Sequence, residues 1–187
     1  MSTVFDRIAI LGAGLIGASI ALAARQSGAA GAVVLYDADE AVRARARDLN
    51  LGEVADSAAA AAAHADLAIL AAPGGALETA AIDAVAPVLP AHAFLVPGHP
   101  IAGTERSGPD AGFASLFQGR WHILTPLEDA RAEYAGAIDQ LEAFWRALGA
   151  EVERMDADRH DVVLAVTSHL PHLIAFNIVA MAEDLES

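Results

Sequence analysis

Apolar and polar positions along this chain follow the alternation of strand and helix that an α/β fold requires. Short apolar runs predict strands at residues 7–11, 32–36, 66–72, 93–96, 121–124 and 151–155, the third a buried parallel strand and the last an edge strand. Helical patterns separate them, at residues 18–26, 40–50, 56–65, 76–88 and 130–148. This order predicts an α/β fold with a Rossmann-type, doubly wound, mostly parallel sheet.

Local residue types set the expected helix ends. Asp56 and Ser57 suit the N-terminus of the alanine-rich helix that follows them, and Gly52 is expected to cap the C-terminus of the helix over 40–50. The helix over 130–148 carries an apolar stripe, which we interpret as core packing. Its members are Tyr134, Ile138, Leu141, Phe144, Trp145 and Leu148.

The character of the chain changes after residue 155. From residue 156 it is helical and apolar, and Pro171 suits either the first turn of a second helix or a kink in one long helix. Apolar side chains there cover more than one helix face, so we expect them to need a partner surface. Residues 1–155 are therefore assigned to the Rossmann-type domain, and residues 156–187 to the first helices of a helical domain.

The strand over 7–11 runs into a glycine motif, G-x-G-x-x-G, that opens a helix. Gly12 permits a tight turn, Gly14 lets a pyrophosphate approach the backbone, and Gly17 allows close helix packing. Asp37 ends the next strand, twenty residues beyond Gly17, where a carboxylate binds a ribose diol. The pattern predicts a dinucleotide site in which NAD is favoured over NADP. The expected cofactor-binding residues are Gly12, Gly14, Leu15, Ile16, Gly17, Asp37 and Pro73.

A carboxylate at this position repels a 2′-phosphate, which is the reason for the preference for NAD. Arg43 or Arg45, which follow Asp37 within one helix, would soften that preference.

A histidine stands between glycine and proline in the run PGHPIAGTERSG, residues 97–108. His99 follows a short apolar stretch, so we expect it to be presented at a strand end, where an imidazole can take a proton near neutral pH. The polar continuation, with Thr104 and Glu105, favours a ligand site over a turn in which the histidine caps a backbone group.

A second histidine run, TSHLPH, occupies residues 167–172. Ser168, His169 and His172 could face a ligand together, or Ser168 and His169 could cap a helix end. With His160 these histidines could also suggest a metal site, but no carboxylate completes a convincing ligand set, so no metal is expected.

Composition narrows the class of protein. Of the 187 residues, 55% are hydrophobic, which is enough for one good core and the start of another. The formal net charge of −14 argues against nucleic acid or an anionic membrane as a partner. No stretch is expected to cross a bilayer and residues 1–6 resemble no leader, which favours a cytoplasmic protein. The chain has no cysteine, which excludes disulfides, thiolate metal sites and thiol catalysis.

The runs GHPIAGTE at 98–105, ILTP at 123–126 and TSHLPH at 167–172, in this order behind the glycine motif, resemble the prephenate/arogenate dehydrogenase family of tyrosine biosynthesis. The resemblance implies NAD-dependent oxidative decarboxylation of prephenate or arogenate, with His99 as the base. It also implies that Thr104, Glu105, Ser168, His169 and His172 bind substrate, and that the helical domain forms a homodimer.

The chain departs from this family pattern in two places. Near Glu78 and Thr79 it is short of one strand and one helix, and with them of a loop serine that helps in the active site. At Ser187 it stops where the family continues into a domain that supplies an arginine for the substrate carboxylate. Both departures keep an alternative open, in which the chain is an NAD-binding module without dehydrogenase activity.

Overall fold

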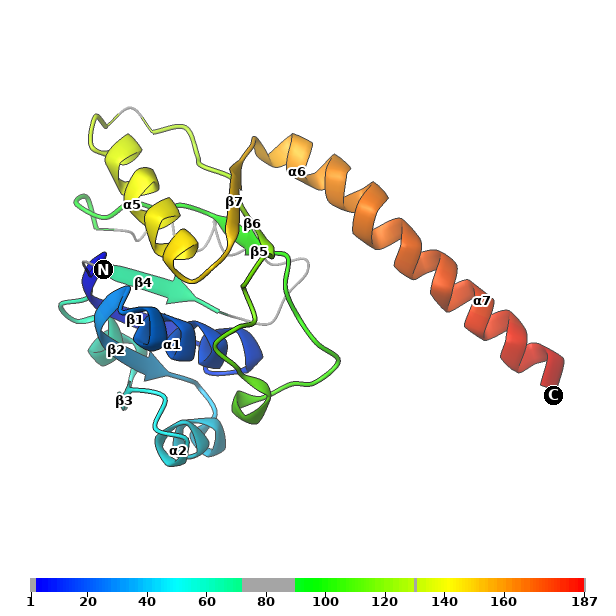
Figure 1. Cartoon of the computed structure of the whole chain (residues 1–187), viewed down its shortest axis with the longest axis horizontal. Helices are drawn as coiled ribbons and strands as arrows, with labels where there is room; N and C mark the ends of the chain where they lie inside the picture. The colour runs from blue at the N-terminus through cyan, green and yellow to red at the C-terminus, as the bar shows by residue number, and fades with distance from the viewer. Residues whose placement is uncertain (1–2, 72–89, 130, 187) are drawn as a thin grey trace.

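The computed structural model describes residues 3–71, 90–129 and 131–186. Its first half is a parallel sheet in the order β3-β2-β1-β4 (Figure 1). The strands are β1 (Phe5–Leu11), β2 (Ala30–Tyr36), β3 (Glu53–Val54) and β4 (Leu67–Leu70), joined by α1 (Leu15–Ser27), α2 (Glu40–Asp48) and α3 (Ala58–Ala62). The predicted alternation of strand and helix is confirmed here, and β1 lies inside the sheet.

Two details of this half differ from expectation. The strand predicted over 66–72 is parallel but not buried: residues of β4 alternate between half-buried and exposed, because among the described residues β4 pairs only with β1 and forms an edge. Gly52 does not cap α2, since the helix ends at Asp48 with Leu49 as its C-cap, and the next residue, Asn50, takes the left-handed conformation with φ of 49°. Ser57 caps α3 as predicted, accepting a hydrogen bond from the backbone of Ala60.

A second, three-stranded sheet has the order β5-β6-β7. Strand β6 (Trp121–Leu124) lies in the middle, antiparallel to β5 (Gly98–Pro100) and parallel to β7 (Glu151–Arg154). A short 3-10 turn, η2 (Pro109–Ala111), lies between β5 and β6, and α5 (Tyr134–Ala147) lies between β6 and β7.

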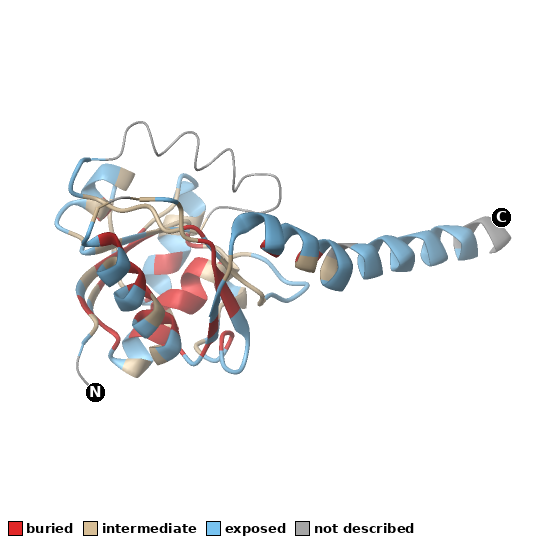
Figure 2. Ribbon diagram, turned by 90° about the horizontal axis from the view of Figure 1, so that it is seen from above, coloured by how far each residue is buried: buried red, intermediate tan, exposed pale blue. Residues whose placement is uncertain are grey.

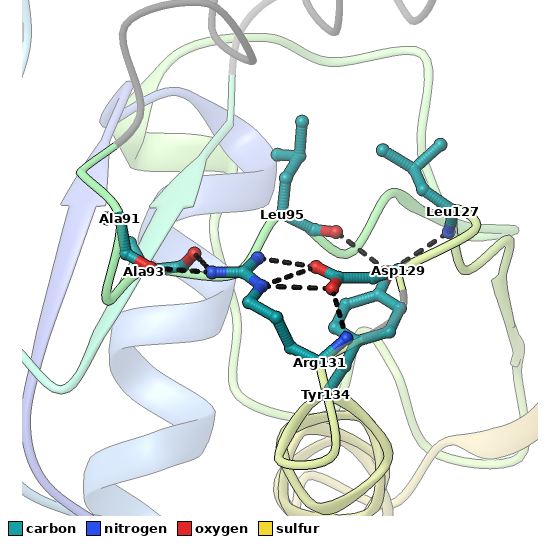
Figure 3. Close-up of polar contacts among 7 residues, drawn as sticks. All are labelled: Ala91, Ala93, Leu95, Leu127, Asp129, Arg131 and Tyr134. Carbon is teal, nitrogen blue, oxygen red and sulfur yellow. Dashed lines mark hydrogen bonds and ion pairs between the residues drawn. The ribbon is translucent and has the colours of Figure 1, made fainter.

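The strand expected over 93–96 is wrong, because side chains take up the backbone carbonyls of this segment (Figure 3). Arg131 donates to the carbonyls of Ala91 and Ala93 at 2.8 and 2.9 Å, and the Tyr134 hydroxyl donates to the carbonyl of Leu95 at 2.9 Å. The guanidinium also pairs with Asp129 and so holds the pKa of that carboxyl below its usual range. These contacts anchor the chain just before β5.

Helix α5 packs against both sheets. Its predicted stripe is confirmed, since all six apolar residues are buried. Phe144 meets Phe5 of β1 edge to face with centroids 5.7 Å apart, and Trp145 stacks on His122 of β6 at 3.8 Å. One helix therefore joins the first sheet to the second.

The C-terminal residues form one continuous helix that leaves the globular body (Figure 1). It comprises α6 (Ala157–Leu164), a π-helical turn η3 (Ala165–His169) and α7 (Leu170–Glu186). Pro171 has no N–H for the carbonyl of Thr167, and the chain adopts the π turn immediately before this proline. The alternative with one long helix is therefore correct, and Ser168 and His169 do not cap a helix end.

Almost all of this helix beyond its first turns is exposed (Figure 2). Phe176 and Met181 are 71% and 68% exposed, and other large apolar side chains surround them. By length and composition alone, the helix over Ala157–Ala182 could cross a membrane, since its most apolar 18-residue window has a mean hydropathy of 1.7. The expectation that no stretch qualifies is thus wrong, because the apolar residues run through Pro171 without a break in the helix.

His122 should make the stability of this fold depend on pH. It is 2% exposed, and burial, followed by the charge of His99, lowers its pKa from 6.5 to about 3. The unfolded chain therefore binds this proton at a higher pH than the folded chain does. The contribution of the neutral His122 to the stability of the fold is therefore complete above pH 6.5, and it is lost as the pH falls toward 3.

Because of His122, we expect the free energy of unfolding to be about 2 kcal/mol lower at pH 5 than at pH 7. Urea unfolding of the wild type and of His122→Leu at both pH values measures this, because leucine keeps the approximate volume and cannot titrate. The loss should be smaller by this amount in the variant. Equal losses in both proteins would show that His122 does not titrate as its burial requires.

Candidate functional site

The glycine motif forms the turn between β1 and α1, at the carboxyl end of the sheet. Gly12 has a φ of 109°, and a Cβ there would lie 2.3 Å from the carbonyl oxygen of Ala71. A Cβ on Gly17 would lie 1.9 Å from the carbonyl oxygen of Gly12. Both positions therefore require glycine, one for its backbone conformation and one for the close approach of α1 to the turn.

The N-terminus of α1 is open to a ligand. Gly14 is the cap residue, has no side chain to satisfy the first helix N–H groups, and has nothing within 4 Å of the place where a Cβ would stand. Leu15 and Ile16 follow in the first turn and are half-buried. Free N–H groups and the helix dipole together suit an anion such as a pyrophosphate.

Asp37 lies over this turn, directly after β2. One carboxylate oxygen accepts from the backbone N–H of Ala13 at 2.8 Å, and the other from Asp39 at 3.0 Å. The acid is thus held beside the glycine turn, in the place where a ribose diol would meet it.

Two arginines near Asp37 are engaged elsewhere. Arg43 donates to the carbonyls of Asp37 and Ala38 at 2.7 and 3.0 Å and lies over the ring of Tyr36. Arg45 forms a two-pronged ion pair with Asp110, with Nε 2.9 Å from Oδ1, and this pairing raises the pKa of the guanidinium. Neither side chain is held ready for a 2′-phosphate.

His99 is the middle residue of β5, whereas the sequence predicted that it would follow the end of a strand. It pairs with Ile123 of β6 and is half-buried. Its Nδ1 is 3.2 Å from Nε2 of His160, on the first turns of α6. The second sheet and the long helix therefore meet at this pair of imidazoles.

His160 contacts His99, although its position in the sequence did not indicate a role at this site. Its side chain is 5% exposed, and its Nδ1 is 3.0 Å from a carboxylate oxygen of Asp161. The Asp156 side chain caps α6 by accepting from the backbone of Arg159 at 2.8 Å, which fixes the first turn that carries His160. The sequence feature that could have indicated this residue is a histidine followed by an acid, His160 and Asp161, in the first turns of a helix capped by Asp156.

The face of the long helix that turns toward the body carries His160 and Leu164, both buried, and then Ser168, half-buried. The π turn inserts one extra residue per turn, which helps to keep Ser168 on this face. His172, one turn further along, is exposed. His169 lies in the π turn, and its side chain is outside the described residues.

Thr104 and Glu105 belong to the exposed loop after β5. They line a shallow hollow of about 380 Å³ together with Arg106 and residues 110–113. The Thr104 hydroxyl accepts a hydrogen bond from the backbone N–H of Arg106 at 3.2 Å. The carboxylate of Glu105 lies 3.9 Å from the guanidinium of Arg106. The loop continues onto α1, where Ser19 accepts from the backbone N–H of Phe113 at 3.1 Å. The hollow thus adjoins the helix that opens at the glycine turn.

Three predictions concern residues outside the described part of the chain, namely Pro73, the helix over 76–88 and the junction at 78–79. Within the described residues, no group of three or more His, Asp and Glu side chains is arranged to hold a metal ion.

Three family models match the chain. Residues 74–154 match the nucleotide-binding domain of prephenate dehydrogenase, and residues 156–187 match the dimerization domain of prephenate dehydrogenase. Residues 7–96 match a family described as coenzyme F420-dependent NADP oxidoreductase.

A solved structure shares the fold. Prephenate dehydrogenase from Aquifex aeolicus, in complex with hydroxyphenyl propionate and NAD⁺, has a TM-score of 0.80 and 29% identity. The comparison covers 97% of this chain and 70% of that one. The first domain is accordingly a Rossmann-type domain, and the relative that shares its fold was solved with NAD⁺ bound.

Two relatives identified by sequence belong to the same family as this solved structure. Prephenate dehydrogenase of Bacillus subtilis is 28% identical over all of this chain and 56% of its own length. Cyclohexadienyl dehydrogenase of Zymomonas mobilis is 42% identical over 208 aligned positions, covering 98% of this chain and 70% of the relative. That alignment is longer than the 187 residues of this chain, which is therefore shorter than its relative within the aligned region. With this identity over most of both chains, the protein belongs to the prephenate dehydrogenase family of oxidoreductases, which serve tyrosine biosynthesis.

Proposed function

We propose that this chain catalyses the NAD-dependent oxidative decarboxylation of prephenate or arogenate, with His99 as the general base. The observation that carries the proposal is the half-buried imidazole of His99, held by His160 in a chain that also has an open glycine turn beside Asp37. NAD held at the glycine turn would supply the acceptor for a hydride from the carbinol carbon of the ring. His99 takes the hydroxyl proton, and carbon dioxide leaves as the ring becomes aromatic.

The remaining site residues have distinct proposed tasks. The N-terminus of α1 holds the pyrophosphate, and Asp37 accepts from the ribose hydroxyls. Ser168, His169 and His172 bind polar groups of the substrate from the long helix, and Thr104 and Glu105 do so from the loop after β5. We also propose that this chemistry takes place in the cytoplasm.

We also propose that the long helix forms a homodimer with a second copy of the chain. Its exposed apolar residues span most of the segment that matches the dimerization domain. Burial of such residues against another subunit stabilises by roughly 1.5–3 kcal/mol for each large side chain. This would also explain why a helix long enough to cross a membrane belongs to a biosynthetic enzyme.

Replacing His99 with Asn should lower kcat by at least about a hundredfold, because the amide cannot act as a base near neutral pH. NADH formation is followed by absorbance with prephenate and with arogenate, while NAD affinity is measured separately and should stay within about twofold. His92→Asn, at an exposed turn residue, is the matched control. A wild type that binds NAD without turning over either substrate would instead favour the NAD-binding module.

Asp37→Asn should weaken NAD binding about tenfold and reduce the discrimination against NADP. The amide still accepts from Ala13 but no longer carries the charge that repels a 2′-phosphate. Calorimetric titration with both nucleotides measures this, independently of turnover. Asp6→Asn makes the same charge change near the opposite end of β1 and should leave both affinities unchanged. Equal discrimination in wild type and Asp37→Asn would remove Asp37 from the ribose site.

The double variant Ile174→Glu, Phe176→Glu should convert the dimer to a monomer, since charged side chains cannot be buried unpaired between two helices. Sedimentation at micromolar concentration measures the change, and circular dichroism checks that the helix content is kept. A wild type that sediments as a monomer over this range argues against the dimer.

A further inference from the structure

His99, His160 and Asp161 form a chain of side chains that runs from the second sheet to the surface. The Nδ1 of His99 lies 3.2 Å from Nε2 of His160, and Nδ1 of His160 lies 3.0 Å from Oδ1 of Asp161. His160 is buried between its partners, and the carboxylate of Asp161 is 80% exposed. The order is therefore acid, buried imidazole, half-buried imidazole.

The ionised carboxylate at the outer end determines which ring nitrogens carry hydrogen. A carboxylate only accepts, so Nδ1 of His160 must donate to Asp161. A neutral imidazole has one donor and one acceptor nitrogen, so Nε2 of His160 accepts from Nδ1 of His99. In His99 the lone pair then lies on Nε2.

We propose that His160, itself oriented by Asp161, is a positioning residue that fixes the tautomer of His99 and makes Nε2 its proton-accepting atom. This inference rests on the proposed role of His99 as the base. When Nε2 takes the hydroxyl proton, the positive charge formed on the His99 ring is stabilised by its hydrogen bond to His160 and by the negative charge of Asp161 beyond it. The bond that breaks is the substrate O–H, and the bond that forms is N–H on His99.

The surroundings make this arrangement specific. The ring of His160 is held by the capped first turn of α6 and by ring contact with His99, with centroids 5.4 Å apart. On the other side, His122 of β6 is buried and neutral, with a pKa of about 3. His122 therefore adds no charge beside His99, and among the contacts of the described residues the carboxylate of Asp161 is the charged group that ends this chain of side chains.

Long-range proton–nitrogen NMR correlation reads the tautomer of each histidine without any need for turnover. In the wild type near neutral pH we expect the proton of His99 on Nδ1, and that of His160 also on Nδ1. In His160→Leu the acceptor is lost, and the proton of His99 should move to Nε2. His160→Gln places an amide oxygen near the lost nitrogen and should restore the Nδ1 proton. His92→Leu is the matched control for the substitution itself.

The kinetics provide a second measurement. His160→Leu should lower kcat by roughly tenfold or more with KM within about twofold, and His160→Gln should recover most of the loss. A wild type with the His99 proton on Nε2, or a tautomer unchanged in His160→Leu, overturns the inference even if the enzyme is active. Absent turnover together with the expected tautomers leaves the tautomer result standing and tells against the proposed function instead. Dispersed amide signals in both variants confirm that they are folded.

Discussion

The contact of α5 with both sheets is the constraint on which the rest of this structure depends. Phe144 reaches Phe5 on β1, while its neighbour Trp145 stacks on His122 of β6, so adjacent residues of one helix bind different sheets. Large aromatic side chains bury much apolar area and pack with defined ring geometry. The glycine turn follows β1, and His99 lies on β5, which pairs with β6, so this helix holds the glycine turn and the proposed base in one body.

Binding of an anion to this molecule depends on groups close to the site rather than on its net charge. The chain carries a formal charge of −14, yet the proposed ligands are anions. Several arginines are already paired, as Arg45 of α2 is with Asp110 of η2, and Arg131 with Asp129 in the loop before α5. Attraction for a pyrophosphate must therefore come mainly from the uncapped N-terminus of α1, whose N–H groups act at short range whatever the total charge.

Local patterns were enough to predict much of the fold. The glycine motif predicted its own turn because Gly12 needs positive φ and Gly17 needs space, which are properties of single residues. The stripe of α5 was readable because helical periodicity directly encodes a buried face. The strand expected over 93–96 was wrong, since apolar residues there suit a strand but Arg131 and Tyr134 take the carbonyls. Periodicity says nothing of which partner satisfies a backbone group.

By itself, the sequence determined the Rossmann-type class, the dinucleotide motif and His99 as the candidate base, because each depends on residue types at short spacing. Only the tertiary structure decided what His99 touches. His160 lies 61 positions away, and their meeting depends on the pairing of β5 with β6 and on the cap that starts α6. The π turn that helps to keep Ser168 on the face of His160 was equally hidden, since it arises where a proline must fit into a continuous helix.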